Sequence, residues 1–135
     1  IPGAKEAILH YNRQGYLVFV VTNQSGVARG YYQEADVHCL HQWMQDELAD
    51  IGAHIDGFFH CPHHPEGKII DYTIKCNCRK PEPGLIRQAM AKWHIDPSRS
   101  FLIGDKPSDM AAAEAAGITG YLFTGGNLYN FVLAL

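Results

Sequence analysis

A continuous run of six apolar residues, from Tyr16 to Val21, constrains this fold most. A strand that is apolar at every position is typical of a parallel sheet buried on both faces. After it, apolar residues recur every three to four positions over 33–51, which predicts an amphipathic helix. The positions expected to face the core there are Val37, Leu40, Trp43, Met44, Leu48 and Ile51.

The rest of the chain repeats this alternation of strand and helix. Residues 61–82 show neither period and hold most of the Cys, His and Pro residues. The order predicts one α/β domain over residues 1–135, a three-layer, Rossmann-like parallel sheet with helices on both faces. We expect helices at 4–14, 33–51, 83–94, 107–116 and near the end of the chain, and strands at 16–21, 55–60, 100–104 and 120–123. Ligands of such sheets bind at the carboxyl ends of the strands.

Composition narrows the classes of partner. The chain has 11 basic and 14 acidic residues, a net charge of −3 and no basic run, which argues against nucleic acid or an anionic membrane as partner. The sequence contains no run of about 18 apolar residues, the length that would suggest a membrane span. Composition therefore gives no indication of a nucleic-acid or membrane partner.

A polar corner directly follows the first predicted strand. Its side chains are small hydroxyls and amides, and a glycine, Gly26, completes it: Thr22, Asn23, Gln24 and Ser25. Such groups, with free backbone N–H groups, suit an anion such as phosphate. A polar turn that merely ends the strand would have the same composition, so both interpretations stay open.

The aperiodic segment contains a C-x-H pair and a C-x-C pair separated by 12 residues. Three thiolates and one imidazole predict a closed, structural zinc site that staples the loop. The expected ligands are Cys61, His63, Cys76 and Cys78. His60 or His64 could replace His63 as the nitrogen ligand. The alternative to a metal site is that three unpaired thiols lie near histidines by chance. We expect Cys39 to be a buried core thiol.

Charged residues gather at two further positions. Arg79 and Lys80 precede a predicted helix and could neutralise a phosphate, although a solvated surface pair is the usual fate of such residues. Asp105 and Asp109 follow another predicted strand, where carboxylates suit Mg²⁺. Asp109 could instead only complement the dipole of the next helix.

The remaining histidines and the tryptophans carry weaker signals. We expect Trp43 and Trp93 to pack in the core. We expect ordinary surface or core roles for the histidines on predicted helices or helix ends: His10, His38, His41, His54 and His94.

Together these motifs resemble the haloacid dehalogenase (HAD) superfamily of phosphohydrolases over about residues 4–125. TNQSG corresponds to its second motif, the lysine of RKP to its third, and GDKPSD to its acidic fourth. More narrowly, VVTNQSGVARGYY, the Cys/His loop and CRKPEPGLI resemble the heptose 1,7-bisphosphate 7-phosphatases of lipopolysaccharide heptose biosynthesis. The histidinol-phosphate phosphatases of the same branch are also similar.

The resemblance implies a cytoplasmic, Mg²⁺-dependent phosphatase with no large cap domain. Its partner would be a small molecule, a sugar phosphate, and we expect a monomer. An aspartate would attack phosphorus, and water would hydrolyse the aspartyl-phosphate. By position, Thr22 would hold a phosphate oxygen, with residues 23–25 lining the same corner. Lys80 would stabilise developing charge, Arg79 would help to recognise the sugar phosphate, and Lys106 would sit beside the phosphate. Asp105 would bind Mg²⁺.

The family's first motif, D-x-D, does not occur in this sequence. We expect the first strand, with the nucleophile and the general acid/base, to lie upstream of these residues. The alternative to an enzyme is a binding or scaffold domain that is held together by zinc and has no catalytic activity. The retained Lys80, Asp105 and TNQS corner argue against it, because a scaffold needs no phosphate site.

Overall fold

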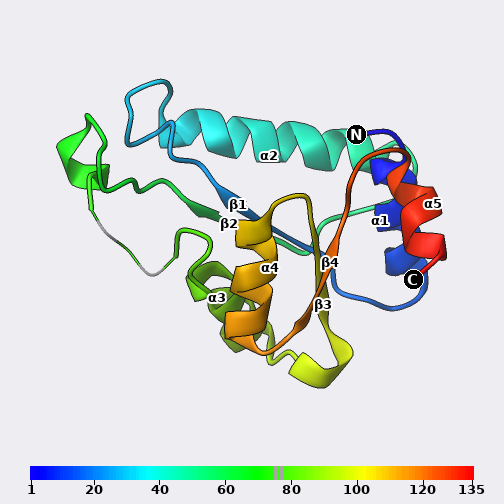
Figure 1. Cartoon of the computed structure of the whole chain (residues 1–135). Helices are drawn as coiled ribbons and strands as arrows, with labels where there is room; N and C mark the ends of the chain where they lie inside the picture. The colour runs from blue at the N-terminus through cyan, green and yellow to red at the C-terminus, as the bar shows by residue number, and fades with distance from the viewer. Residues whose placement is uncertain (75, 77) are drawn as a thin grey trace.

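The computed structural model describes residues 1–74, 76 and 78–135, and it confirms the expected alternation of elements. Short 3₁₀ turns, η1 (Ile70–Tyr72) and η2 (Pro97–Arg99), lie in the loops. The helices are α1 (Ala4–Arg13), α2 (Glu34–Ala49), α3 (Gly84–Trp93), α4 (Pro107–Ala116) and α5 (Leu128–Leu133), and the strands are β1 (Phe19–Asn23), β2 (Gly57–Cys61), β3 (Phe101–Gly104) and β4 (Thr119–Leu122) (Figure 1).

All four strands pair in parallel, as predicted, but they form two separate pairs. β1 pairs with β2, so that Phe19 faces Gly57, and β3 pairs with β4, so that Phe101 faces Thr119. β1 and β3 each therefore pair on one side only within the described chain. The carboxyl ends of these two strands supply most of the candidate site.

Helices cover both faces of the β1–β2 pair, with α2 on one side and α3 on the other (Figure 1). One apolar cluster lies on the α1 and α2 side and contains Leu48, Ala53 and Ile55. The other centres on Leu85 of α3 and includes two cysteines of the Cys/His loop, Cys61 and Cys78. The loop is thus part of the core where it meets α3.

The apolar run did not extend as a strand over its whole length. Tyr16 and Leu17 are 43% and 47% exposed, and β1 begins only at Phe19. Tyr16 instead packs edge-on against Tyr11 and Phe101, so the start of the run serves as a cover over α1 and β3.

The buried face of α2 differs from the prediction. Val37, His41 and Leu48 are buried, and the His41 ring stacks on Phe58 with centroids 4.2 Å apart. Burial lowers the pKa of His41, which favours its neutral form. Because an α-helix turns about 100° per residue, Trp43 lies about 120° away from Val37.

Several expected core residues of α2 and its end are therefore exposed. Trp43 is 59% exposed, and Leu40 and Ile51 are 47% and 39% exposed. Cys39 is also exposed, so its prediction as a core thiol was wrong. Trp93 is 38% exposed, although its ring packs against Phe19 with centroids 5.7 Å apart. Among the helices described, none combines the length and apolar character that a membrane crossing needs.

Candidate functional site

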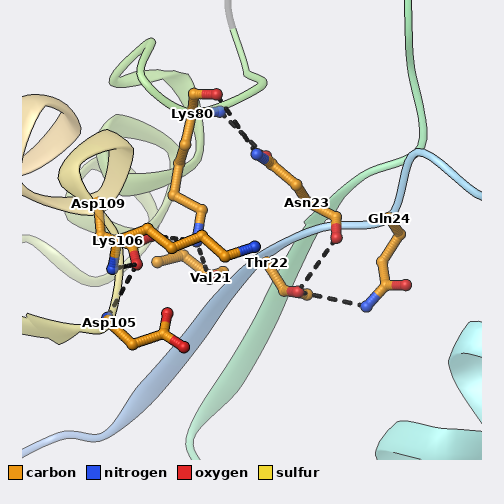
Figure 2. Close-up of polar contacts among 8 residues, drawn as sticks. All are labelled: Val21, Thr22, Asn23, Gln24, Lys80, Asp105, Lys106 and Asp109. Carbon is orange, nitrogen blue, oxygen red and sulfur yellow. Dashed lines mark hydrogen bonds and ion pairs between the residues drawn. The ribbon is translucent and has the colours of Figure 1, made fainter. Parts of the chain in front are cut away.

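Three segments distant in sequence meet at the carboxyl ends of β1 and β3. β1 contributes its last residues, Thr22 and Asn23, and the β3–α4 connection contributes Asp105 and Lys106 (Figure 2). Lys80 reaches into the same place from the loop before α3 (Figure 2). The expected meeting of polar residues at strand ends therefore occurs.

Lys80 and Asp109 form a buried ion pair at the centre of this arrangement. The Lys80 Nζ lies 2.5 Å from Asp109 Oδ1, and the two side chains are only 15% and 6% exposed. Lys80 Nζ also donates to the carbonyl of Val21 at 3.3 Å. Burial alone would raise the pKa of Asp109, but the hydrogen bond and charge of Lys80 outweigh it and lower the pKa.

Asp109 also organises the end of β3. Its Oδ2 accepts the backbone N–H groups of Asp105 at 3.1 Å and Lys106 at 3.2 Å. Gly104 permits this approach, because a Cβ at that position would lie 2.4 Å from the Cβ of Asp109. Two roles were left open for Asp109, a Mg²⁺ ligand and a partner of the next helix. In the structure, Asp109 contacts the N-terminus of α4 and pairs with Lys80 (Figure 2).

Asn23 fixes the backbone of Lys80 to the end of β1. The Asn23 Oδ1 accepts the Lys80 N–H at 3.0 Å, and the Asn23 amide donates to the Lys80 carbonyl at 3.3 Å. These two reciprocal bonds align the lysine along the strand end. The Asn23 side chain is therefore already engaged, and its contribution to the site is to hold Lys80.

Of the remaining corner residues, Gln24 contacts the Thr22 hydroxyl and Ser25 closes the following turn. Gln24 donates its amide to Thr22 Oγ1 at 3.2 Å, and its backbone N–H bonds the Cys61 carbonyl at 2.7 Å. The Ser25 carbonyl accepts the backbone N–H of Arg29, which closes the following turn. Hydrogen bonds therefore hold the corner in one conformation and connect it to the end of β2.

Asp105 and Lys106 remain open to solvent beside this corner. The Asp105 carboxylate has no hydrogen-bond partner within the described chain, and Lys106 extends its side chain from the end of β3 toward β1 (Figure 2). A single exposed carboxylate fits Mg²⁺, which usually combines one or two carboxylates with water and phosphate oxygens.

The Cys/His loop brings its four expected ligands together. The donor atoms of Cys61, His63, Cys76 and Cys78 all lie within 4.8 Å of one another. The Cys61 sulfur lies 2.7 Å from that of Cys78 and 3.3 Å from that of Cys76. The His63 Nδ1 lies 3.5 Å from the Cys78 sulfur. Three thiols and one imidazole converging in this way could hold zinc in a closed tetrahedral site.

The thiols of this cluster differ in acidity. Burial raises the pKa of Cys61 and of Cys78. Burial also opposes ionisation of Cys76, but hydrogen bonds from the Cys61 and Cys78 thiols overcome it and lower the pKa of Cys76 to about 6. Cys76 is therefore the thiol that ionises most readily before a metal supplies its own charge.

The two alternative histidines are engaged elsewhere. His60 Nε2 lies 2.8 Å from Glu34 Oε1, and His64 Nε2 lies 2.9 Å from a guanidinium nitrogen of Arg29. Of the three candidates, the geometry therefore favours His63 as the nitrogen ligand.

Arg79 directly follows Cys78 of the cluster. Its Nε is buried and has no hydrogen-bond partner within the described residues. A buried donor without a partner is costly, so an anion at this position would be stabilising.

Other contacts that the motifs did not indicate hold the loop in place. The backbone N–H groups of Lys68 and Ile69 both donate to the Ala28 carbonyl, at 2.6 and 2.8 Å. Glu34 accepts the Tyr72 hydroxyl at 3.0 Å as well as contacting His60. Such pairings lie far apart in sequence, and no local pattern signals them.

The chain is similar to phosphatases over most of its length. A HAD-hydrolase-like family model matches residues 77–129. The D-glycero-beta-D-manno-heptose-1,7-bisphosphate 7-phosphatase of Rhodopseudomonas palustris is 51% identical over 98% of this chain and 73% of its own length. The enzyme of the same name from Escherichia coli K12 is 43% identical over 87% of this chain and 62% of its own length.

Solved structures agree with these sequence comparisons. The D,D-heptose 1,7-bisphosphate phosphatase of B. bronchiseptica, complexed with magnesium and phosphate, has a TM-score of 0.83 and 34% identity over 99% of this chain and 70% of its own. A putative HAD-like phosphatase from Mesorhizobium loti gives 0.86 and 35%, over 93% and 61%. The chain thus spans between three fifths and three quarters of the length of these relatives.

Proposed function

Because the chain belongs to the heptose-1,7-bisphosphate 7-phosphatase family of HAD-like hydrolases, we propose that it serves in the Mg²⁺-dependent removal of the 7-phosphate from D-glycero-D-manno-heptose 1,7-bisphosphate. The family sequence relationship covers nearly the whole chain. Reduced thiols at the Cys/His cluster fit the cytoplasm as the compartment.

The observation that carries the proposal is the buried Lys80–Asp109 pair between two strand ends. Asp109 and the Val21 carbonyl hold the Lys80 ammonium in place beside Thr22 and Asp105 (Figure 2). A cation fixed in advance where charge develops on a transferring phosphoryl group lowers the barrier without reorganisation. A purely structural ion pair would not require this alignment with the end of β1.

The other residues take roles around the same phosphoryl group. Thr22 donates its hydroxyl to a phosphate oxygen, and Lys106 adds a cation from the opposite strand end. Ser25 and the backbone of the corner complete the phosphate contacts. Arg79, whose buried Nε has no partner among the described residues, binds an anionic part of the sugar phosphate. Together these groups orient the phosphoryl group, which is the main task in phosphoryl transfer.

The nucleophile in this proposal is an aspartate outside these 135 residues. It attacks phosphorus, the sugar alkoxide leaves with a proton from a second carboxylic acid, and water then hydrolyses the aspartyl-phosphate. β1 and β3 each have one side that no described strand pairs with, which leaves room for such a strand between them. Mg²⁺ bound to Asp105 would offset the repulsion between the carboxylates and the phosphate.

The test is phosphate release by the purified full-length protein. We expect Mg²⁺-dependent release of one phosphate from heptose 1,7-bisphosphate, with kcat/KM well above that for histidinol phosphate. Faster turnover of histidinol phosphate would replace the proposed substrate. Failure to bind either Mg²⁺ or phosphate would favour the scaffold alternative.

Replacing Asp105 with asparagine should lower kcat/KM about 10²- to 10³-fold, because the isosteric amide removes the charge that binds Mg²⁺. The concentration of Mg²⁺ needed for half-maximal activity should rise. Asp50→Asn makes the same change at the exposed end of α2 and should alter activity less than about twofold. An Asp105→Asn enzyme with an unchanged Mg²⁺ titration would show that Asp105 is not a metal ligand.

A further inference from the structure

Tyr32 ends the VVTNQSGVARGYY stretch, where no sequence pattern indicated a role for it, but its hydroxyl contacts the phosphate corner. The Tyr32 O–H donates to Gln24 Oε1 at 2.5 Å. Gln24 in turn donates its Nε2 to Thr22 Oγ1 at 3.2 Å (Figure 2). The three side chains therefore form one chain of hydrogen bonds that ends on the hydroxyl proposed to contact phosphate.

The direction of this chain determines what the Thr22 hydroxyl can do. An amide can present either its oxygen or its nitrogen to a neighbour, and in this structure the Gln24 oxygen accepts the Tyr32 hydroxyl. The Gln24 nitrogen then faces Thr22 and occupies a lone pair on Oγ1. The hydroxyl hydrogen of Thr22 must therefore point elsewhere.

Among the described residues, that hydrogen has only a weak partner. The Thr22 Oγ1 lies 3.4 Å from the Asn23 carbonyl oxygen, which is long for a hydroxyl donor. A phosphate oxygen would be a better acceptor, because hydrogen bonds to charged groups are the stronger ones. The hydrogen is thus available to an incoming phosphate at little cost.

The loop is shaped to bring Tyr32 back over this corner. The backbone N–H of Tyr31 donates to the Gly26 carbonyl at 2.9 Å, which closes the turn after the corner. A Cβ at Gly26 would lie 2.2 Å from the Tyr32 ring, so only glycine allows the ring to pack there. The ring position is therefore fixed by packing, independently of the hydroxyl.

We propose that Tyr32 is a positioning residue that acts through Gln24 to hold the Thr22 hydroxyl as a donor to the substrate's phosphate. This inference rests on the proposed function and adds a residue to its phosphate site. It predicts that the hydroxyl of Tyr32, rather than its ring, matters to phosphate binding.

The experiment compares Tyr32→Phe with Tyr31→Phe in the full-length enzyme. Both variants remove one hydroxyl, and the neighbouring Tyr31 is 70% exposed. Phenylalanine keeps the ring over Gly26, so the Tyr32 variant should fold. We expect Tyr32→Phe to weaken binding of inorganic phosphate, measured by calorimetry with Mg²⁺ present, about 5- to 10-fold and to lower kcat/KM equally. Tyr31→Phe should change neither by more than about twofold.

Two further variants separate positioning from a general structural effect. Gln24→Glu keeps an acceptor for Tyr32 but cannot donate to Thr22, so it should weaken phosphate binding at least as much. In a Thr22→Val background, Tyr32→Phe should have no additional effect on phosphate affinity. An undiminished effect there, or equal behaviour of the two tyrosine variants, would overturn the proposal.

Failure of the proposed function would look different. A wild-type enzyme that binds phosphate but releases none from the heptose bisphosphate would overturn the substrate assignment, while the phosphate titrations would still test Tyr32. A wild-type enzyme that turns over the substrate, with Tyr32→Phe indistinguishable from Tyr31→Phe, would overturn the role of Tyr32 alone.

Discussion

Replacing Lys80 with methionine is expected to lower kcat/KM about 10²- to 10³-fold, the usual effect of losing one group that stabilises transition-state charge. The same change leaves the buried carboxylate of Asp109 without its cation, since Asp109 is 4% exposed and pairs with Lys80. Breaking a buried ion pair from one side costs about 3–5 kcal/mol of folding stability. Chemical denaturation and steady-state kinetics measure the two effects separately.

A second substitution distinguishes the two effects. Asn at position 109 keeps an oxygen for the N–H groups of Asp105 and Lys106 but carries no charge. The Lys80→Met/Asp109→Asn variant should therefore recover part of the lost stability and none of the activity. Lys92→Met, on the exposed side of α3, should affect neither. Recovery of activity along with stability would mean that Lys80 has only a structural role.

The dependence of the free energy of unfolding on acidic pH gives an independent check of the Lys80–Asp109 ion pair. The pKa of Asp109 is lowered in the folded state, so its contribution to stability is complete above its unfolded pKa of about 4. That contribution disappears as the pH falls through the lower, folded pKa. The free energy of unfolding should therefore fall less steeply below about pH 4 in Lys80→Met than in the wild type. Equal slopes of the free energy of unfolding against pH in the two proteins would show that Lys80 does little to lower the pKa of Asp109.

The sequence allowed the elements and the strand-end residues to be predicted, because both depend on local patterns. An apolar run followed by polar residues indicates a strand end, and carboxyl ends of parallel strands meet on one edge. Thr22 and Asp105 could be predicted in this way, whereas Lys80 was a candidate only as a cation that precedes a predicted helix. The pairing of Lys80 with Asp109 was not, because nothing local connects residues 29 positions apart.

Other features depended on tertiary packing and therefore escaped prediction. The apolar spacing of α2 indicated a helix, but a histidine, His41, occupies its buried face while Trp43 is exposed. Among the three candidate histidine ligands, the geometry favours His63, because Glu34 and Arg29 engage His60 and His64. The described residues form two parallel strand pairs where one sheet was expected, and no local pattern indicates which strands pair.

Replacing Cys78 with serine should have the second of the two largest effects. The full-length protein is expected to hold one zinc ion per chain, and Cys78→Ser should lose most of it, because it removes one of four converging ligands. Elemental analysis of purified protein measures the zinc content. Cys39→Ser removes an exposed thiol of α2 and is the matched control, with full zinc content expected.

Loss of the metal should also displace residues of the phosphate site, because Cys78 directly precedes Arg79 and Lys80. Without zinc, the two hydrogen bonds to Asn23 alone must hold the Lys80 backbone on β1. A displacement of about 1 Å in a catalytic group can lower activity about 10²-fold. We therefore expect kcat/KM of Cys78→Ser to fall at least that far, and the loop at 61–82 to become sensitive to proteolysis. A zinc-free variant with wild-type kcat/KM would show that the metal stabilises the loop without positioning Lys80.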